Sequence, residues 1–167
     1  MDSESHSQTE RLHAYWRMPY IKANGKSTDS SNPFANLKDS DKFKHHILVK
    51  GRHTCILLNL FPYNAGHLLV IPFREVSDIS DLNEAEQKEF MEFMIKAKSL
   101  LIKALNPNGF NIGFNLGKAA GAGIPQHLHC HVVPRWEGDH NFMPVISNTR
   151  VLPESIEEMW KQLKQYC

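Results

Sequence analysis

Three histidines stand at every second position of the segment QHLHCHVVPRW, residues 126–136. They are His127, His129 and His131. An imidazole has an unperturbed pKa of about 6.5, so it can serve as nucleophile, acid or base near neutral pH. Neighbouring imidazoles also oppose each other's protonation, which favours a neutral and nucleophilic central ring. The segment therefore predicts covalent or acid–base catalysis.

The spacing of the three imidazoles fits a β-strand, which we predict over residues 126–134. Alternate side chains of a strand share a face, so the histidines would point one way and the residues between them into the core. At about 3.3 Å per residue the outer two histidines would lie roughly 13 Å apart, whereas a Zn–N bond is about 2 Å long. Separate imidazoles along one elongated substrate are therefore favoured over a three-histidine metal centre. A solvent-facing strand that happens to carry histidine would explain one such residue better than three in register.

The rest of the sequence predicts the elements that would position this strand. β-Branched runs predict a hairpin and a third strand, and a capping box at Asn83 and Glu86 predicts a long helix that ends at 106–109. The hairpin strands are expected at 46–51 and 53–60, the third strand at 66–73, a fourth at 110–116, and a short C-terminal helix over 154–166. This order predicts an α+β domain with a mostly antiparallel five-stranded sheet, one long helix and a C-terminal helix.

Composition limits the domain organisation and the class of partner. The chain has 167 residues, 41% of them hydrophobic, and predicts a disordered tail over 1–10 followed by a single domain over 11–167. A formal net charge of +1 argues against a nucleic-acid or membrane partner, and no apolar run is long enough to cross a bilayer. The N-terminus is unlike a signal peptide, and the three cysteines form no CxxC motif, so we predict a cytoplasmic protein with reduced thiols.

His-x-His-x-His followed by two apolar residues resembles the signature of the histidine triad superfamily of nucleotide hydrolases and transferases. FNIGFNLGKAAGAGIPQHLHCHVVPRW is similar to the family's strand, glycine loop and strand, and NLFPYNAGHLLVIP is similar to its earlier Asn-to-GHxLVxP segment. The likeness covers residues 45–136, the expected core of the domain. The Pro-Arg pair after the triad, the spacing from Asn59 to His67 and the GDHNFMP tail look closest to two branches. These are the fragile-histidine-triad dinucleoside polyphosphate hydrolases and the bacterial diadenosine tetraphosphate phosphorylases.

The resemblance implies a catalytic role for each histidine. His129 would attack the α-phosphorus and form a nucleotidyl-histidine intermediate. His127 would orient His129 through hydrogen bonding, and His131 would contact the phosphate and the leaving group. His67 would support the triad from the adjacent strand. Such covalent catalysis divides one difficult displacement into two easier steps.

Five further residues are expected to bind substrate. By resemblance, Asn59 would hydrogen-bond the ribose hydroxyls, and Asn115 and Gln126 would lie near the phosphates. Lys118 and Arg135 could offset phosphate charge, although ordinary solvated surface explains each of them equally well. Arg135 is the favoured cation because it directly follows the histidine strand.

The sequence leaves several other residues open. Phe61 and Tyr63 could stack on a base, but packing within a turn explains them equally well. Arg150 could offset phosphate charge. Asp139 and His140 are candidates for the wall of the site that no pattern favours.

The chain departs from the family at its metal site. Many members bind a structural zinc through an early Cys-x-x-Cys, a later histidine and the first histidine of the triad. Here the Cys-x-x-Cys segment, residues 32–35, reads NPFA, and the later position is Glu75. With these ligands missing, we predict no structural zinc and a different role for His127. Magnesium could accompany the polyphosphate, although the sequence shows no protein ligands for it.

We therefore predict an enzyme that cleaves dinucleoside polyphosphates such as diadenosine tetraphosphate at the α-phosphate. Phosphate or water would be the acceptor, and the context of the triad favours phosphate. The alternatives are a nucleoside phosphoramidase of the same family, a non-catalytic nucleotide-binding protein and a metal-binding protein. Glycine-rich stretches at 113–119 and 121–123 match neither a P-loop nor a dinucleotide-binding fold in spacing. The resemblance also implies a homodimer whose two sheets join into one.

Overall fold

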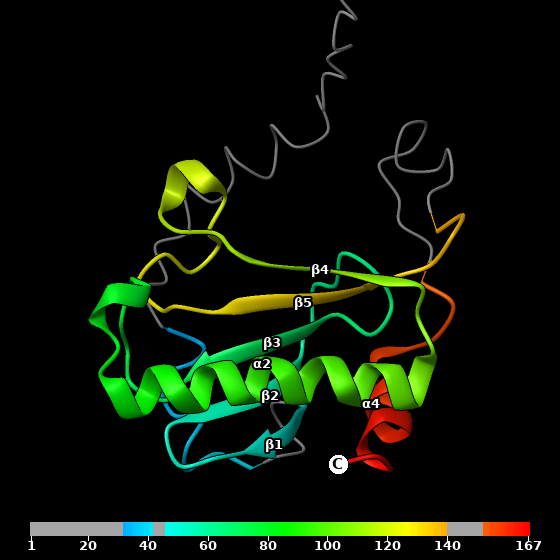
Figure 1. The fold of residues 1–167 in the computed structure, drawn as a ribbon, viewed down its shortest axis with the longest axis horizontal. Coiled ribbons are helices and arrows are strands. Elements are labelled where there is room, and N and C mark those ends of the chain that lie inside the picture. Colours follow the sequence, from blue (N-terminus) through cyan, green and yellow to red (C-terminus); the bar gives the residue numbers. More distant parts are fainter. Residues whose placement is uncertain (1–31, 42–45, 140–151) are drawn as a thin grey trace, which may run out of the picture. The chain divides into compact units, whose positions relative to one another are not determined.

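A computed structural model describes residues 32–41, 46–139 and 152–167, all within the unit Ser31–Cys167. The strands are β1 (Ile47–Lys50), β2 (Thr54–Leu58), β3 (Leu68–Pro72), β4 (Gly109–Phe114) and β5 (Cys130–Arg135). They form one antiparallel sheet in the order β1-β2-β3-β5-β4 (Figure 1). The predicted α+β class and five-stranded sheet are confirmed. The tail predicted over 1–10 and the domain start at residue 11 lie outside the described residues.

The strand predicted over 126–134 is shorter than expected, because β5 begins only at Cys130. Its pairing with β3 covers Leu68 to Val70 and stops there. Pro72 has no backbone N–H to continue that ladder, and its carbonyl lies 2.8 Å from the ring Nε2 of His127 instead of a backbone donor. His127 and His129 therefore lie in the segment that leads into β5, and only His131 lies on the strand.

Helix α2 (Glu84–Leu105) runs across one face of the sheet (Figure 1). Its start confirms the capping box: the Asn83 side chain accepts from the Glu86 backbone, and the Glu86 carboxylate accepts from the Asn83 backbone. The helix ends where Asn106 takes the left-handed conformation. Two short 3-10 turns, η1 (Ile79–Asp81) and η2 (Lys118–Ala120), lie in the loops.

Helix α4 (Ile156–Lys164) confirms the predicted C-terminal helix, with Ser155 as its N-cap. Its buried residues Met159, Trp160 and Leu163 join the apolar cluster beneath α2. Among the residues described, no helix is both long and apolar enough to span a bilayer.

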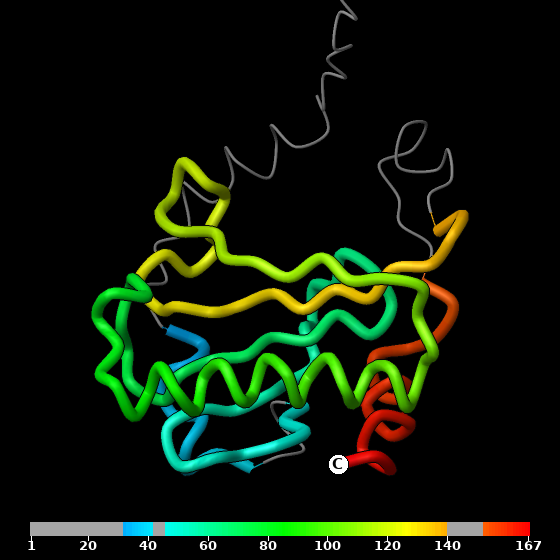
Figure 2. Tube along the Cα trace, viewed as in Figure 1, coloured from blue at the N-terminus to red at the C-terminus, as the bar shows by residue number. Residues whose placement is uncertain are grey.

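The two faces of the sheet carry different apolar clusters. Along β2, Ile56 and Leu58 face α2, whereas Cys55 and Leu57 face the other way. This second face is covered by the segment 32–41, which contributes Phe34 and Leu37 to its own smaller cluster and lies beside the β1–β2 hairpin (Figure 2, blue). Since Leu69 belongs to this second cluster and pairs with His131, the histidine side of β5 shares the face covered by 32–41.

Candidate active site

The structure brings four histidines together on the second face of the sheet. The ring centroids of His129 and His131 lie 5.1 Å apart, and His67, which directly precedes β3, also lies 5.1 Å from His131. His67 and His127 are fully buried, His129 is 8% exposed, and His131 is half-buried. The imidazoles thus form a row of separate rings, with His131 nearest to solvent.

A single hydrogen bond fixes the protonation pattern of His129. Its Nδ1 lies 2.8 Å from the backbone carbonyl oxygen of His127, and a carbonyl can only accept. The hydrogen of the neutral ring must therefore reside on Nδ1, which leaves a lone pair on Nε2. Burial lowers the pKa of His129, so the ring stays neutral at physiological pH. The arrangement leaves Nε2 with a lone pair that is chemically able to act as a nucleophile.

A chain of hydrogen bonds sets the opposite pattern on His131. The backbone N–H of Tyr63 donates to Nδ1 of His67 over 3.0 Å, so the remaining hydrogen of neutral His67 lies on Nε2. That Nε2 lies 2.9 Å from Nδ1 of His131, which must accept. His131 then carries its hydrogen on Nε2. Burial, and next the neighbouring His129, lower the pKa of His131 to about 4. The ring thus offers an N–H donor without carrying a charge.

The strand beside His131 leaves the site open. Gly113 of β4 pairs with His131, and a side chain at Gly113 would meet nothing within 4 Å. Two residues further, Nδ2 of Asn115 lies 3.4 Å from Nε2 of His131. Because that Nε2 donates, a hydrogen bond between them requires the amide to be turned so that Oδ1 faces the ring. Of the residues predicted to lie near phosphates, Asn115 is therefore brought to the triad.

The loop after β2 holds the Tyr63 ring beside the histidines and exposes the Phe61 ring to solvent. The Asn59 amide accepts from the Phe61 backbone over 3.0 Å and lies 3.3 Å from Nδ1 of His67, so it shapes this loop. The Tyr63 ring stacks on His131 with centroids 5.2 Å apart and an interplanar angle of 27°. Phe61 is 85% exposed, so packing within the turn does not explain it. The role of Asn59 towards ribose stays a prediction.

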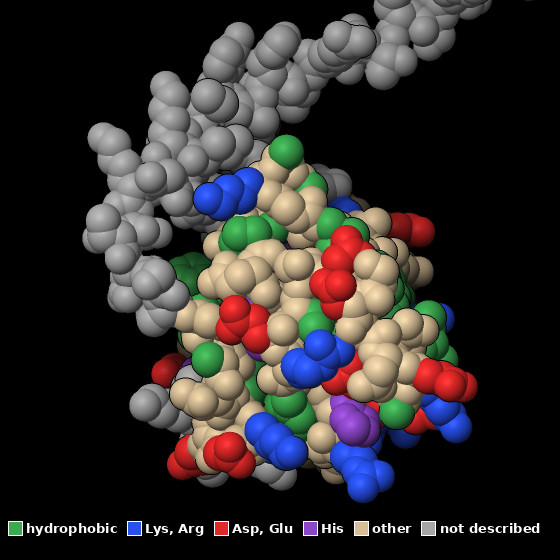
Figure 3. All heavy atoms as spheres, turned by 90° about the vertical axis from the view of Figure 1, so that its left-hand side faces the viewer, with side chains coloured by type: hydrophobic (Ala, Val, Ile, Leu, Met, Phe, Trp, Pro, Cys, Tyr) green, Lys and Arg blue, Asp and Glu red, His purple; other side chains and the backbone are tan. Residues whose placement is uncertain are grey.

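The glycine loop places Lys118 and Gln126 on the surface. Lys118 lies in η2, between Gly117 and Gly121, which both have positive φ and therefore favour glycine. Gln126 is exposed and lines a depression of about 500 Å³ together with Arg74 and other residues of the loop after β3. Figure 3 shows this end of the domain, where basic side chains alternate with acidic ones. Any phosphate recognition there would be local.

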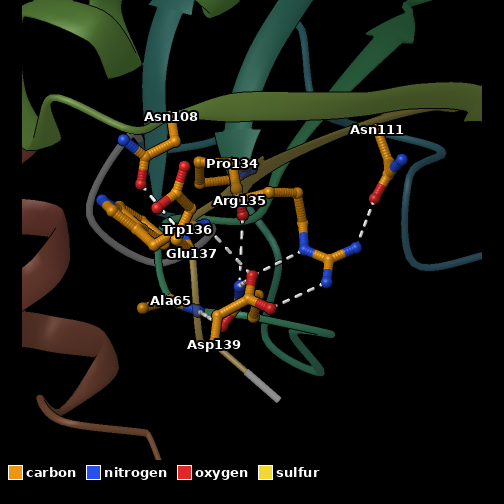
Figure 4. A network of polar contacts seen from close by, with 9 residues as sticks. Ala65, Asn108, Asn111, Pro134, Arg135, Trp136, Glu137 and Asp139 are labelled. Atoms are coloured by element: carbon orange, nitrogen blue, oxygen red, sulfur yellow. Dashed lines mark hydrogen bonds and ion pairs between the residues drawn. The ribbon is translucent and has the colours of Figure 1, made fainter.

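Arg135 is not brought to the histidines. It lies at the far end of β5, four residues or about 13 Å along the strand from His131. Its guanidinium forms an ion pair with Asp139 at 2.6 Å and donates to the Asn111 side chain at 2.6 Å (Figure 4). Asp139 also accepts from Asn64 and from the Trp136 backbone. A contact between Arg135 and phosphate stays a prediction, and Arg150 and His140 lie outside the described residues.

The positions that replace the family's zinc ligands meet in the structure. The Nδ2 of Asn32 donates to the Glu75 carboxylate over 2.6 Å and lies 2.8 Å from Nδ1 of His127. An amide nitrogen and the Ala35 side chain are not zinc ligands, so this set of residues does not fit the metal. In the described part of the chain, no three His, Cys, Asp or Glu side chains are grouped to hold a metal ion. Sequence comparison marked Asn32 and Glu75 as substitutions but did not predict that they bond to each other.

The model of the HIT domain matches residues 40–138. The chain belongs to the HIT domain family. It is 37% identical over 157 residues to a Mycobacterium tuberculosis protein named AP-4-A phosphorylase, a match that covers 90% of this chain and 80% of that protein. A Schizosaccharomyces pombe bis(5'-nucleosyl)-tetraphosphatase (asymmetrical) is 31% identical over 56% of this chain and 50% of its own. The predicted assignment to the histidine triad family, and to its enzymes, is confirmed.

Solved HIT structures agree with the fold. The crystal structure of the Caenorhabditis elegans NitFhit protein superposes with a TM-score of 0.59 and 32% sequence identity, over 72% of this chain and 26% of that one. A hypothetical histidine triad nucleotide-binding protein of Sulfolobus tokodaii gives a TM-score of 0.64 over 80% of this chain and 89% of its own. At 22% identity this second match shows the shared fold alone.

Proposed function

We propose that this HIT enzyme cleaves dinucleoside polyphosphates, such as diadenosine tetraphosphate, at the α-phosphorus, and that inorganic phosphate is the acceptor. The observation that carries the proposal is the bond from Nδ1 of His129 to the His127 carbonyl. It leaves a lone pair on Nε2 of a buried ring whose pKa is lowered. A neutral, oriented imidazole is what nucleophilic attack on phosphorus requires near neutral pH.

The reaction has two displacements. In the first, Nε2 of His129 attacks the α-phosphorus, a P–N bond forms, and the bond from phosphorus to the bridging oxygen breaks. The leaving polyphosphate keeps the electron pair, and the Nε2–H of His131 donates a hydrogen bond to the departing oxygen. In the second, an oxygen of inorganic phosphate attacks the same phosphorus and restores the lone pair of His129. Diadenosine tetraphosphate and phosphate would give ADP and ATP.

The choice of acceptor rests on the relatives. The protein that matches 90% of this chain is named a phosphorylase, which favours phosphate. The Schizosaccharomyces pombe relative is named a tetraphosphatase, but it matches only 56% of this chain. With water as acceptor the products would be AMP and ATP.

The position of Asn115 beside His131 supports a role for its side chain at the phosphates. Backbone N–H groups of the glycine loop would stabilise developing charge. Asn59, Lys118 and Gln126 complete the binding set, and the exposed rings of Phe61 and Tyr63 stack on a base. Magnesium would accompany the substrate as its charge partner. Residues of this chain supply the nucleophile and the donors.

We also propose a homodimer in the cytoplasm. β4 lies at the edge of the sheet, where a second copy could extend it. Exposed apolar side chains lie on β4 and on the outer surface of α2, namely Ile112, Met91, Ile95 and Ile102. Light scattering after gel filtration measures the mass directly, and a monomer at micromolar concentration would contradict the dimer.

Product analysis tests the function. Purified protein is incubated with diadenosine tetraphosphate, with and without inorganic phosphate, beside the His129→Ala variant. We expect ADP and ATP only when phosphate is present and no turnover by the variant. AMP and ATP without phosphate would assign water as the acceptor. Turnover of adenosine phosphoramidates alone would indicate a phosphoramidase, and binding without any turnover would indicate a nucleotide-binding protein.

A further inference from the structure

We propose that Asn32 and Glu75 form a polar clamp that fixes the ring of His127 and, through it, the lone pair of His129. The clamp lies at the positions that correspond to the family's zinc site, where the residues present do not fit the metal. Its kinetic consequence rests on the proposed function, whereas its effect on the His127 ring does not.

Both nitrogens of His127 are held by groups with only one possible role. Nε2 lies 2.8 Å from the Pro72 carbonyl, which can only accept, so Nε2 carries the hydrogen. Nδ1 then has a lone pair and faces Nδ2 of Asn32 at 2.8 Å, which can only donate. The two contacts select one tautomer of a neutral ring. With His127 1% exposed, no water competes for either nitrogen.

Asn32 connects His127 to Glu75 because both hydrogens and the oxygen of its amide take part in hydrogen bonds. Nδ2 has two hydrogens, one for Nδ1 of His127 and one for the Glu75 carboxylate at 2.6 Å. Oδ1 accepts from the Phe34 backbone over 2.9 Å. The carboxylate keeps the amide from rotating its oxygen towards His127, because an oxygen there would face both a lone pair and a negative charge.

The clamp acts on the nucleophile through the backbone and through Phe34. The carbonyl of His127 is the acceptor that places the hydrogen of His129 on Nδ1. The Phe34 ring, anchored through Asn32, contacts both imidazoles edge-on with centroids 5.6 Å from each. If the His127 ring becomes mobile, we expect the His127 carbonyl and the Phe34 ring, which both contact His129, to become mobile as well. Asn32 and Glu75 are therefore positioning residues for the reaction.

The experiment combines ring-nitrogen NMR with steady-state kinetics on the full chain. The variants are Asn32→Ala, Glu75→Ala and Glu75→Gln, with Asn36→Ala as a matched control, since Asn36 is an exposed asparagine of the same segment. Nitrogen-15 shifts report the tautomer of each histidine. Chemical denaturation reports stability.

We expect wild type and Asn36→Ala to show His127 as the Nε2–H tautomer alone. Asn32→Ala should give a mixture of tautomers at His127 and lower kcat about ten- to a hundredfold while KM changes little, because a small misplacement affects reaction more than binding. Glu75→Ala should act in the same direction, and Glu75→Gln should recover most of the loss because its amide oxygen still accepts from Asn32. If Asn32→Ala fails to fold, the comparison of the two exposed Glu75 variants decides.

An unchanged His127 tautomer together with wild-type kcat in both alanine variants would overturn the clamp. If wild type turns over no dinucleotide, the proposed function fails, but the NMR comparison still tests the clamp. Elemental analysis of the purified chain adds a further check. One equivalent of zinc per chain, with loss of the single tautomer on its removal, would also overturn the proposal.

Discussion

The two ends of β5 carry polar networks of opposite kinds on the same face of the sheet. At the N-terminal end, the neutral rings of His129, His131 and His67 form a row in which His131 is only half-buried. At the C-terminal end, Arg135 and Asp139 form an ion pair. Asn111 accepts a hydrogen bond from Arg135, and Asn64 donates one to Asp139. Neither end is typical of a strand that serves only to fill a core.

The difference lies in what each network leaves available. Both oxygens of Asp139 accept hydrogen bonds, from Arg135, Asn64 and the Trp136 backbone, so the charged end is satisfied within the chain. The histidine end uses one nitrogen of His129 internally and leaves the other with a lone pair. Hydrogen bonds between neutral groups fix the orientation of the imidazoles, and they leave the lone pair on Nε2 of His129 available. We infer that the histidine end serves chemistry and the charged end serves stability.

The largest expected effect is the loss of the lone pair at the histidine end. His129→Ala should lower kcat by at least about a thousandfold, because a covalent mechanism has no substitute for its nucleophile. Binding should persist, since the proposed phosphate and base contacts do not involve His129, and isothermal titration with a non-hydrolysable dinucleotide would measure it. A variant that kept a tenth of the wild-type kcat would remove His129 from the role of nucleophile.

A substitution at the charged end should lower the stability of the fold and leave turnover nearly unchanged. Asp139 is 8% exposed, and Asp139→Asn replaces the carboxylate of a partly buried pair by an amide, so we expect a loss of about 2–3 kcal/mol. The midpoint of urea unfolding measures it. Turnover per folded molecule should stay within about threefold of wild type.

The matched control is Glu158→Gln, which breaks the pair of Glu158 with Lys161. Both of those side chains are more than half exposed, so the unfolding midpoint should hardly move. If Asp139→Asn leaves the midpoint unchanged but lowers kcat, the charged end takes part in the reaction and the comparison fails.

The sequence could predict the histidine end better than the charged end, for a physical reason. Alternation and helical spacing specify the faces of strands and helices, and they placed the sheet, α2 and the histidine row. The place of Arg135 after the triad makes it a candidate for offsetting phosphate charge, but its partner Asn111, and the partner Asn64 of Asp139, come from distant segments. Such pairing depends on how loops return to the sheet, which local pattern does not encode.

The start of β5 and the clamp show the same limit. Pro72 ends the β3–β5 ladder early, and its carbonyl becomes the partner of His127. The bond between Asn32 and Glu75 joins positions 43 residues apart, which only the folded chain brings together. The family likeness indicated what these positions had lost, and the structure shows what replaced it.

The pH dependence of catalysis should report on the histidine end. Burial, before any other cause, lowers the pKa of His127, His129 and His131, that of His131 to about 4. The acid limb of kcat/KM should therefore have its midpoint well below about 6.5, with little change between pH 8 and pH 7. A midpoint at or above pH 6.5 would contradict a buried neutral row.

The free energy of unfolding should also depend on pH through the imidazoles of His127, His129 and His131. In the unfolded chain these imidazoles regain a pKa of about 6.5, so between that pH and the lower folded values the unfolded state binds more protons. Their contribution is fully present above about pH 6.5 and is lost as the pH falls through the folded pKa values. Unfolding midpoints measured from pH 8 to pH 4 should decline in this window, and a variant with glutamine at His131 should decline less.

The smallest effect is expected at Phe61, a solvent-exposed residue of the loop after β2. If its ring stacks on a base, Phe61→Ala should raise KM for diadenosine tetraphosphate about fivefold with kcat nearly unchanged, since stacking is worth about 1–3 kcal/mol per base when fully formed. Phe61→Tyr should keep most of the affinity, because a ring remains. Tyr166→Ala removes another exposed aromatic, on the turn after α4, and should leave KM unaltered. Equal KM values for Phe61→Ala and wild type would mean that this ring serves some other contact, and the substrate-facing part of the histidine end would then be limited to Tyr63 and Asn115.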